Sequence, residues 1–151
     1  MPYIQFIRSK VGAANIFLNF AGVWIENANG VLLDRRLDND EWGLIGGAME
    51  LGESAMDAAQ RECKEETGLD AKVGDLIGVY TNAQNTLPNG DQYQAVLMMY
   101  YAQVDPSLDP VASSESREVR YFPRAHLPEL GFEQHRVIAR DALAGRKGVS
   151  W

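Results

Sequence analysis

The sequence has little cysteine, few positive charges and no long apolar run. Cys63 is its only cysteine, so no disulfide can form within the chain, and a reducing compartment fits. Lysine and arginine number 14 against 21 aspartates and glutamates, and the resulting net charge of −7 argues against a nucleic-acid-binding surface. No stretch approaches the roughly 18 apolar residues of a membrane span, and the start MPYIQFIRSKVG lacks a signal peptide's apolar core. We therefore expect a cytoplasmic protein that binds neither membranes nor nucleic acid.

What the chain does contain is typical of a globular domain. Hydrophobic residues make up 46% of it and charged residues 23%, which are ordinary proportions for a soluble fold. A chain of 151 residues has the usual length of one domain. We expect residues 1–151 to form a single domain. The negative net charge does not exclude small anionic substrates, because a bound metal ion can invert the local charge.

Segments of β-forming residues alternate with turn signals and helical patterns. Asn-Gly within Asn27–Gly30 supplies the positive φ of a tight hairpin, so we expect the strands Phe17–Glu26 and Val31–Leu37 to pair. Pro-Asn-Gly in the loop Thr81–Gln92 marks another tight turn. This mixture predicts an α/β or α+β domain with a mixed sheet covered by helices. Further strands are expected at Tyr3–Arg8, Trp42–Ile45, Ala71–Tyr80, Tyr93–Val104 and Val119–Phe122, with Tyr93–Val104 central, and a final helix at Phe132–Leu143.

A second helix is predicted between Ser54 and Gly68. Ser54 is a typical N-cap, and Asp57 lies three residues on, where a carboxylate suits the free amides of the first turn. Gly68 is a typical residue to end a helix. The buried face is expected to comprise residues at helical spacing, namely Met56, Ala59, Cys63 and Thr67.

Three glutamates of this helix point to a metal site. Glu62, Glu65 and Glu66 are three and four residues apart, so they share one helix face and repel one another. A cation relieves that repulsion, and a cluster of carboxylate oxygens suits a hard divalent ion such as Mg²⁺. A charged helix face is more often simply solvated, so this spacing alone does not decide between the two interpretations.

The stretch Gly46–Leu69, GGAMELGESAMDAAQRECKEETGL, resembles the signature of the Nudix hydrolase family. Cys63 takes an aliphatic position of that signature, where cysteine packs as a small hydrophobe. The preceding DRRLDNDEWGLIGG resembles the family's lead-in, with Ile45 where a proline commonly stands. All seven fixed positions are matched, by Gly47, Glu53, Arg61, Glu62, Glu65, Glu66 and Gly68.

The resemblance implies a Nudix-like α/β/α sandwich that hydrolyses a nucleoside diphosphate linked to another group, by attack of water at phosphorus. It implies Mg²⁺, or Mn²⁺, as cofactor. Arg61 is expected to fix the carboxylates by paired hydrogen bonds. A further acid from a distant loop serves as ligand or general base; Glu115 is preferred over Glu118, and Glu62 or Glu65 could equally be the base. The implied metal ligands are Gly46, Glu53, Glu62, Glu65 and Glu66.

Substrate-binding residues are open to two interpretations. Arg35 and Arg36 either contact phosphates or form a solvated strand end. Trp42, Tyr80 and Tyr93 either stack on a nucleobase or belong to the core, and His126 and His135 are expected to be structural.

Three functions remain. ADP-ribose or a related nucleotide sugar is the leading substrate. The alternatives are a housecleaning hydrolase of oxidised nucleoside triphosphates and a non-catalytic nucleotide-binding module, although the complete carboxylate set disfavours the module. A homodimer through the N-terminal strand is a further possibility.

Overall fold

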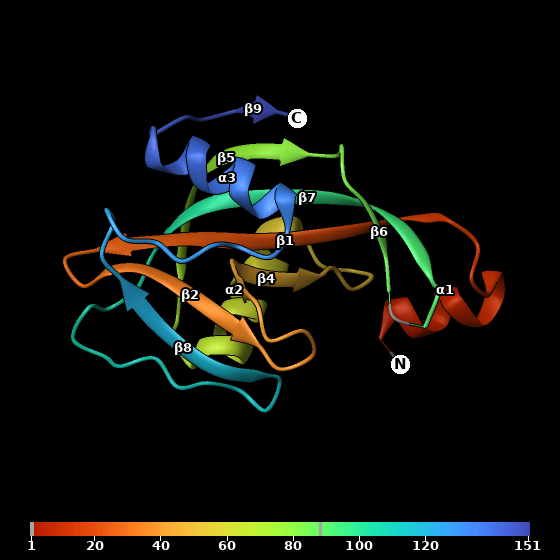
Figure 1. Ribbon diagram of the computed structural model, residues 1–151, viewed down its shortest axis with the longest axis horizontal. Coiled ribbons are helices and arrows are strands. Elements are labelled where there is room, and N and C mark those ends of the chain that lie inside the picture. The colour runs from red at the N-terminus through yellow and green to blue at the C-terminus, as the bar shows by residue number, and fades with distance from the viewer. Residues whose placement is uncertain (1, 88) are drawn as a thin grey trace.

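The two longest strands, β1 (Ile16–Asn27) and β7 (Gln92–Gln103), run parallel at the centre of the fold. The structure is a computed structural model that describes residues 2–87 and 89–151. Ile16 of β1 is in register with Tyr93 of β7, and the pairing continues to Ile25 and Ala102. Every other strand attaches to this pair directly or through one neighbour, and Figure 1 shows the pair at the centre. The expected central position of the segment 93–104 is therefore confirmed.

The predicted hairpin forms at the end of β1. Asn27 and Gly30 face each other across the turn, and β2 (Gly30–Arg36) returns antiparallel to β1. Gly30 has a φ of 117°, and a Cβ there would collide with the backbone of Phe122. Phe122 lies on β8 (Ser116–Phe122), which pairs antiparallel with β2. Only glycine fits this crossing of the hairpin turn and β8.

The segment 42–45, expected to be one strand, belongs to two. β3 (Trp42–Gly43) pairs with β2, and β4 (Ile45–Ala48) pairs with β1, so the chain changes partner at Leu44. The main path of the sheet runs β3-β2-β1-β7-β5-β9, with β4, β6 and β8 attached to its sides. The remaining strands are β5 (Lys72–Tyr80), β6 (Gln84–Thr86) and β9 (Val149–Ser150).

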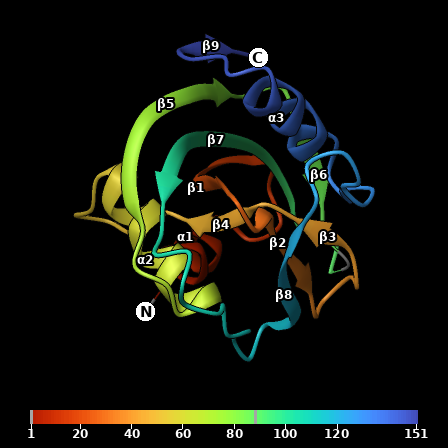
Figure 2. The same cartoon turned by 90° about the vertical axis from the view of Figure 1, so that its left-hand side faces the viewer.

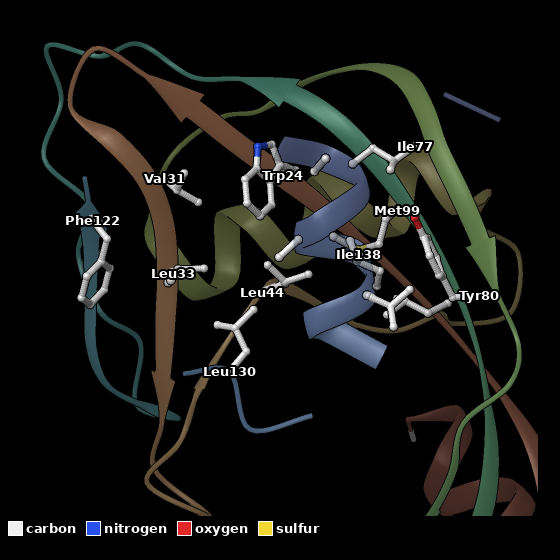
Figure 3. Close-up of a cluster of buried hydrophobic side chains, with 14 residues drawn as sticks. Trp24, Val31, Leu33, Leu44, Ile77, Tyr80, Met99, Phe122, Leu130 and Ile138 are labelled. Atoms are coloured by element: carbon white, nitrogen blue, oxygen red, sulfur yellow. The ribbon is translucent and has the colours of Figure 1, made fainter. Parts of the chain in front are cut away.

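Helices flank this mixed sheet, as predicted. α2 (Ala55–Thr67) and α3 (Glu133–Leu143) lie on opposite sides of the central strands in both views (Figures 1 and 2). Each helix covers its own cluster of buried side chains. One cluster joins Ala59 and Cys63 of α2 to strand residues such as Ile45. The other cluster joins α3 to the strands on its side. Figure 3 shows the second cluster, which includes Leu33, Leu44, Tyr80, Met99 and Ile138.

The N-terminal segment is a helix, α1 (Tyr3–Val11), and the predicted strand at Tyr3–Arg8 is wrong. The dimer contact expected from an N-terminal strand loses its basis with it. Apolar residues at Ile4, Ile7 and Val11 follow a helical spacing, and three or four apolar residues in a short segment do not distinguish that period from a strand.

The predicted loop 81–92 contains a short strand. β6 pairs with the beginning of β7, with Asn85 opposite Tyr93. Pro88 lies outside the described residues. Two residues later, Gly90 has a φ of 89°, and its amide donates to the carbonyl of Leu87 at 2.9 Å. A tight turn therefore ends the loop before β7 begins.

Candidate active site

Helix α2 begins and ends where the sequence predicts. The Ser54 hydroxyl accepts from the Asp57 amide at 3.1 Å, and the Asp57 carboxylate accepts from the Ser54 amide at 3.0 Å, which completes a capping box. Gly68 adopts the left-handed conformation with a φ of 73°. Ala58, Ala59, Cys63 and Thr67 are buried, but Met56 is 43% exposed. The prediction that Met56 faces the core is wrong, because Ala58 occupies the inward-facing position in the first turn of α2.

Arg61 holds three carboxylates together. Its Nη2 contacts Glu53 Oε1 at 2.6 Å, and its Nη1 contacts Glu62 Oε1 at 2.7 Å and Glu65 Oε2 at 3.3 Å. Nη2 also donates to the carbonyl of Ala48 at 3.0 Å. The hydrogen bonds from Arg61 lower the pKa of Glu53, and the carboxylates in turn raise the pKa of Arg61. Arg61 is therefore the local counter-charge that positions these side chains.

Glu62 faces a hollow that glycine leaves for it. A Cβ on Gly47 would lie 2.6 Å from each oxygen of the Glu62 carboxylate, so Gly47 has no tolerable replacement while Glu62 keeps this position. The Glu62 side chain is only 14% exposed. Burial raises its pKa despite the hydrogen bond from Arg61. A carboxylate here favours an additional cation.

Glu66 is bound by a backbone amide rather than by Arg61. The Gly46 amide donates to Glu66 Oε2 at 3.0 Å. Gly46 is in register with Gly22 of β1, and because its amide points away from β1, its carbonyl points away as well. Burial, followed by the charges of Asp34 and Glu62, raises the pKa of Glu66 well above the usual value. The Gly46 carbonyl and the Glu66 carboxylate are therefore directed to the same side of β4.

Asp34 is a member of this cluster that sequence reasoning did not single out as a candidate. Its side chain is 5% exposed, and Oδ1 has no hydrogen-bond partner within residues 2–87 and 89–151. Burial raises the pKa of Asp34, although the Ser116 hydroxyl lowers it in part. The available signal was an aspartate inside the apolar strand GVLLDRR, two residues after Leu32 and so on the same face. A buried, partly unpaired carboxylate of this kind marks a candidate site.

The two arginines at the end of β2 differ in their surroundings. Arg36 pairs with Asp38 at 2.7 Å, lies 5.8 Å from the Phe132 ring and is close enough to Glu66 for their charges to interact. Arg35 pairs with Asp40 at 3.0 Å. Arg36, but not Arg35, therefore adjoins the carboxylate cluster.

Trp42 and Arg35 lie beside each other in register and line an open hollow of about 300 Å³. The Trp42 ring packs edge-on against Phe122 with their centroids 4.7 Å apart, and the Arg120 guanidinium lies 5.6 Å from the Trp42 centroid. Trp42 thus has partners on the protein already. Tyr93 is half-buried, and its ring centroid lies 5.7 Å from that of Phe20. Burial raises its pKa, and the charge of nearby Arg36 offsets part of that rise.

Tyr80 is a core residue, and its assignment to the substrate site is wrong. The side chain is fully buried, and its hydroxyl donates to Asp141 Oδ2 of α3 at 2.8 Å. Of the two interpretations that the sequence leaves open for Tyr80, stacking on a nucleobase or burial in the core, the structure shows the second. The partner that buries it lies 61 residues away. His135 is structural as expected: its Nδ1 accepts from the Leu44 amide at 3.2 Å.

The two acids considered as a distant partner point differently. Glu115 lies in the turn before β8, and its charge reaches both Asp34 and Glu62, whose pKa values it raises. Glu118 lies within β8 opposite Arg35, and it pairs with Arg120 at 3.0 Å. Glu115 therefore adjoins the carboxylate cluster, and the preference for it over Glu118 stays a prediction.

The donor set fits a hard cation, although the ligands are not drawn together as they lie. Within the described part of the chain, no three His, Cys, Asp or Glu side chains are arranged closely enough to hold a metal ion. Glu53, Glu62 and Glu65 instead each contact the Arg61 guanidinium. Asp34, Glu62 and Glu66 nevertheless share a region where burial raises each pKa. Their oxygens are the ligand type that Mg²⁺ and Mn²⁺ prefer.

Comparison with known proteins identifies the class. The NUDIX domain family model matches residues 18–142. The chain belongs to the Nudix hydrolase family, whose members act on small nucleotide substrates and generally use divalent metal ions. It is therefore a Nudix pyrophosphohydrolase.

Individual relatives agree with this family. A protein of Methanocaldococcus jannaschii named ADP-ribose pyrophosphatase is 33% identical over 127 residues, which cover 82% of this chain and 72% of the relative. A Bacillus subtilis protein named "Putative 8-oxo-dGTP diphosphatase" is 50% identical over 50 residues, which are 33% of this chain and 34% of that protein. A crystal structure of a NUDIX hydrolase from Nitrosomonas europaea has 26% identity and a TM-score of 0.67, covering 89% of this chain and 79% of its own.

Among residues 2–87 and 89–151, no helix is both long and apolar enough to cross a membrane.

Proposed function

We propose that the protein hydrolyses the diphosphate of ADP-ribose or a similar nucleotide sugar in the presence of Mg²⁺ or Mn²⁺. The observation that carries this proposal is the group of three sheltered carboxylates, Asp34, Glu62 and Glu66. Of these, only Glu62 forms an ion pair with an arginine in the part of the chain that the structure describes. Such a group favours a divalent cation, which in turn attracts a diphosphate. The 33% identity to a protein named ADP-ribose pyrophosphatase supports the choice of substrate.

Each residue of the site has a proposed role. A divalent ion bound here would polarise a phosphoryl oxygen and lower the pKa of an attacking water. Arg61 positions the carboxylates, and Arg36 is placed to contact a phosphate beside them. The residues proposed to hold the metal are the Gly46 carbonyl and the side chains of Glu53, Glu62, Glu65 and Glu66. Asp34 joins this proposed set because it is buried and its Oδ1 has no hydrogen-bond partner within the described residues.

The proton of the attacking water needs an acceptor. We assign it to Glu115, whose turn adjoins Asp34 and Glu62 and which forms no ion pair within the described residues. Glu62 and Glu65 are the other candidates, but both are held by Arg61. A base must be free to accept a proton, and this favours Glu115.

The hollow beside Arg35 and Trp42 is the proposed binding site for the sugar that is linked to the diphosphate of the substrate. It is lined by charged groups, including Asp40, Glu41 and Arg136, as well as by the Trp42 ring. Polar hydroxyls of a sugar suit such a lining, because each can both donate and accept.

A substrate panel tests the proposal. Purified protein is incubated with ADP-ribose, NADH, dinucleoside polyphosphates, coenzyme A and oxidised dGTP, each with Mg²⁺, with Mn²⁺ or with neither. Release of AMP from ADP-ribose only when metal is added is the expected result. If no compound is hydrolysed with either metal, the enzymatic proposal is wrong.

Hydrolysis of oxidised nucleoside triphosphates is the second candidate. It is favoured by the 50% identity, over 50 residues, to the Bacillus subtilis protein. Because that match spans only a third of each chain, it concerns fewer of the elements that form the site. Turnover of oxidised dGTP at a higher kcat/KM than ADP-ribose would establish this candidate instead. A non-catalytic module is disfavoured because all the carboxylates of the family signature, Glu53, Glu62, Glu65 and Glu66, are present.

The cytoplasmic location of the protein is also a proposal. Cys63 is buried, and burial raises its thiol pKa to about 11, which suits a thiol that remains reduced in the cytoplasm.

A homodimer is tested by the molar mass in solution, with a value near 16.7 kDa indicating a monomer. Absence of a shift with single- and double-stranded oligonucleotides tests the expectation that nucleic acid is not a partner.

A further inference from the structure

The N-terminal helix α1 is capped by Glu50, which lies in the loop between β4 and α2, residues 49–54, here called the Nudix loop. The first amides of a helix need acceptors, which a side chain at the N-cap usually provides. Here the N-cap is Pro2, which makes no side-chain cap, and the first turn holds no acidic residue. The Tyr3 amide instead donates to Glu50 Oε2 at 2.7 Å, across 47 residues of sequence. Glu50 thus places its charge at the positive end of α1.

A series of hydrogen bonds leads from that cap to the candidate active site. Glu50 begins a tight turn whose Gly52 has a φ of 89°. The Glu50 amide donates to Glu53 Oε1 at 2.7 Å, and Arg61 Nη2 contacts the same oxygen at 2.6 Å. Arg61 Nη1 then contacts Glu62 at 2.7 Å. The turn that α1 holds is therefore the one that positions Glu53 and, through it, Arg61.

α1 is tied to the fold at its other end by Arg8. The Arg8 guanidinium donates to the carbonyl of Gln92 at 2.7 Å and to that of Ala14 at 2.7 Å, and it lies 3.5 Å from Asp91. Figure 1 shows α1 at the end of the molecule where β7 begins. The helix therefore bridges the Nudix loop and the turn that precedes β7.

Burial does not explain this arrangement. No residue of α1 is buried, and its apolar Phe6 and Val11 are 43% and 37% exposed. The polar contacts of Tyr3 and Arg8 are therefore the main interactions that orient the helix. An element with so little buried surface adds little to the core, but it can fix two loops relative to each other.

We propose that Glu50 is a positioning residue: by capping α1 it fixes the turn from Glu50 to Glu53 and so presets Arg61 and Glu62 for the metal. This inference rests on the proposed metal-dependent function. It concerns the side chain of Glu50 and the N-terminal helix, neither of which contacts the metal. Loss of the cap loosens the turn and weakens metal binding by about three- to tenfold, as expected for the loss of one N-cap interaction.

Two variants of Tyr3 isolate the amide. Tyr3→Pro removes the N–H that Glu50 accepts, and proline is tolerated at the first position of a helix. Pro2 already has the extended conformation, with a ψ of 143°, that a residue before proline requires. Tyr3→Ala removes the same side chain but keeps the amide. Because Tyr3→Pro changes no charge, its effect cannot come from altered electrostatics at the metal.

Titration with Mn²⁺ alone, followed by calorimetry, provides the readout. We expect Tyr3→Pro and Glu50→Ala each to weaken Mn²⁺ binding three- to tenfold, and Tyr3→Ala and Leu51→Ala to leave it within about twofold. Leu51 is the matched loop control, because it adjoins Glu50 and is 77% exposed. Hydrogen exchange of residues 50–53 should quicken in the first two variants only.

The double variant decides whether the two groups act together. If Glu50 acts through the Tyr3 amide, Tyr3→Pro with Glu50→Ala binds Mn²⁺ no more weakly than Glu50→Ala alone. Additive losses, or unchanged binding in Tyr3→Pro, would overturn the inference. The proposed function fails in a different way: wild-type protein that does not bind Mn²⁺ lacks the metal site itself. Circular dichroism of each variant identifies any that fails to fold.

Discussion

Two sheltered carboxylates, one on each of the two large helices, have opposite surroundings. Asp141 of α3 accepts a hydrogen bond from the Tyr80 hydroxyl at 2.8 Å and one from Arg146 at 2.9 Å, so both its oxygens have a partner. Glu66 of α2 has one backbone amide and lies near the partly unpaired Asp34. Both groups lie between a helix and the sheet, where Asp141 is buried and Glu66 is half-buried.

The difference separates structure from function. A buried charge with matched partners fastens two elements, as Asp141 fastens α3 to β5. A buried charge without them costs stability and persists where a ligand supplies the missing partner. Asp141 should therefore matter for folding and Glu66 for metal and activity. Each prediction below tests that separation.

Glu66→Gln should have the largest effect. The change removes a proposed ligand while it keeps the side chain's size, so kcat/KM should fall by at least about 100-fold. Stability without metal should stay the same or rise, because burial raises the pKa of Glu66 and its ionised form therefore opposes folding at neutral pH. Hydrolysis assays and thermal unfolding measure both effects. Asp70→Asn, which changes an exposed carboxylate two residues after Gly68, is the control.

Asp141→Ala should act the other way. It leaves the buried Tyr80 hydroxyl and the Arg146 guanidinium without their acceptor, so the free energy of unfolding should fall by about 2–4 kcal/mol. Activity per folded molecule should change less than about threefold. Urea unfolding gives the first quantity, and kcat/KM at low temperature gives the second. Asp75→Ala removes an exposed pair with Lys147 and serves as control, with at most about 1 kcal/mol lost. Equal losses in both variants would refute the structural role of Asp141.

Asp34→Asn tests the site residue that sequence reasoning missed. If Asp34 assists metal binding, Mn²⁺ affinity should fall about 10- to 100-fold. Stability should not fall, because burial raises the pKa of Asp34 and the amide removes that charge. A drop in the unfolding temperature with unchanged Mn²⁺ binding would instead make Asp34 a structural residue like Asp141. Leu32→Val, two residues earlier on the same strand face, controls for a change in the packing of β2.

The contrast between local and distant interactions also explains what the sequence could predict. Ser54, Asp57 and Gly68 define α2 correctly because a capping box and a C-terminal glycine act within a few residues. The spacing of Glu62, Glu65 and Glu66 follows from helix geometry alone, so the shared carboxylate face was predictable too.

The errors involve partners far away in the sequence. Tyr80 becomes a core residue through Asp141, and α1 receives its cap from Glu50. Asp34 joins the site because the strand that bears it passes the C-terminal part of α2, which no local pattern reveals. In each case the sequence showed the chemical group, but its partner depended on the tertiary fold.

The smallest expected effect concerns His135, a buried group on the α3 side. Burial, followed by the charge of Arg36, lowers its pKa from about 6.5 to about 4. Its Nδ1 accepts from the Leu44 amide, which requires the unprotonated nitrogen. Above pH 6.5 the folded and unfolded chains are both neutral at this position, so His135 contributes nothing to the pH dependence there. As pH falls from 6.5 towards 4, only the unfolded chain gains the proton, and stability decreases.

His135→Gln should therefore flatten that decrease. The free energy of unfolding of the wild type should drop between pH 6.5 and 4 by about 2–3 kcal/mol more than that of the variant. Carboxylates titrate over the same interval in both proteins, so only the difference between the two curves reports on His135. His126→Gln is the matched control, because His126 is exposed and its replacement should leave the curve unchanged. Parallel wild-type and His135→Gln curves would show that the imidazole is protonated in the folded protein as readily as in the unfolded chain.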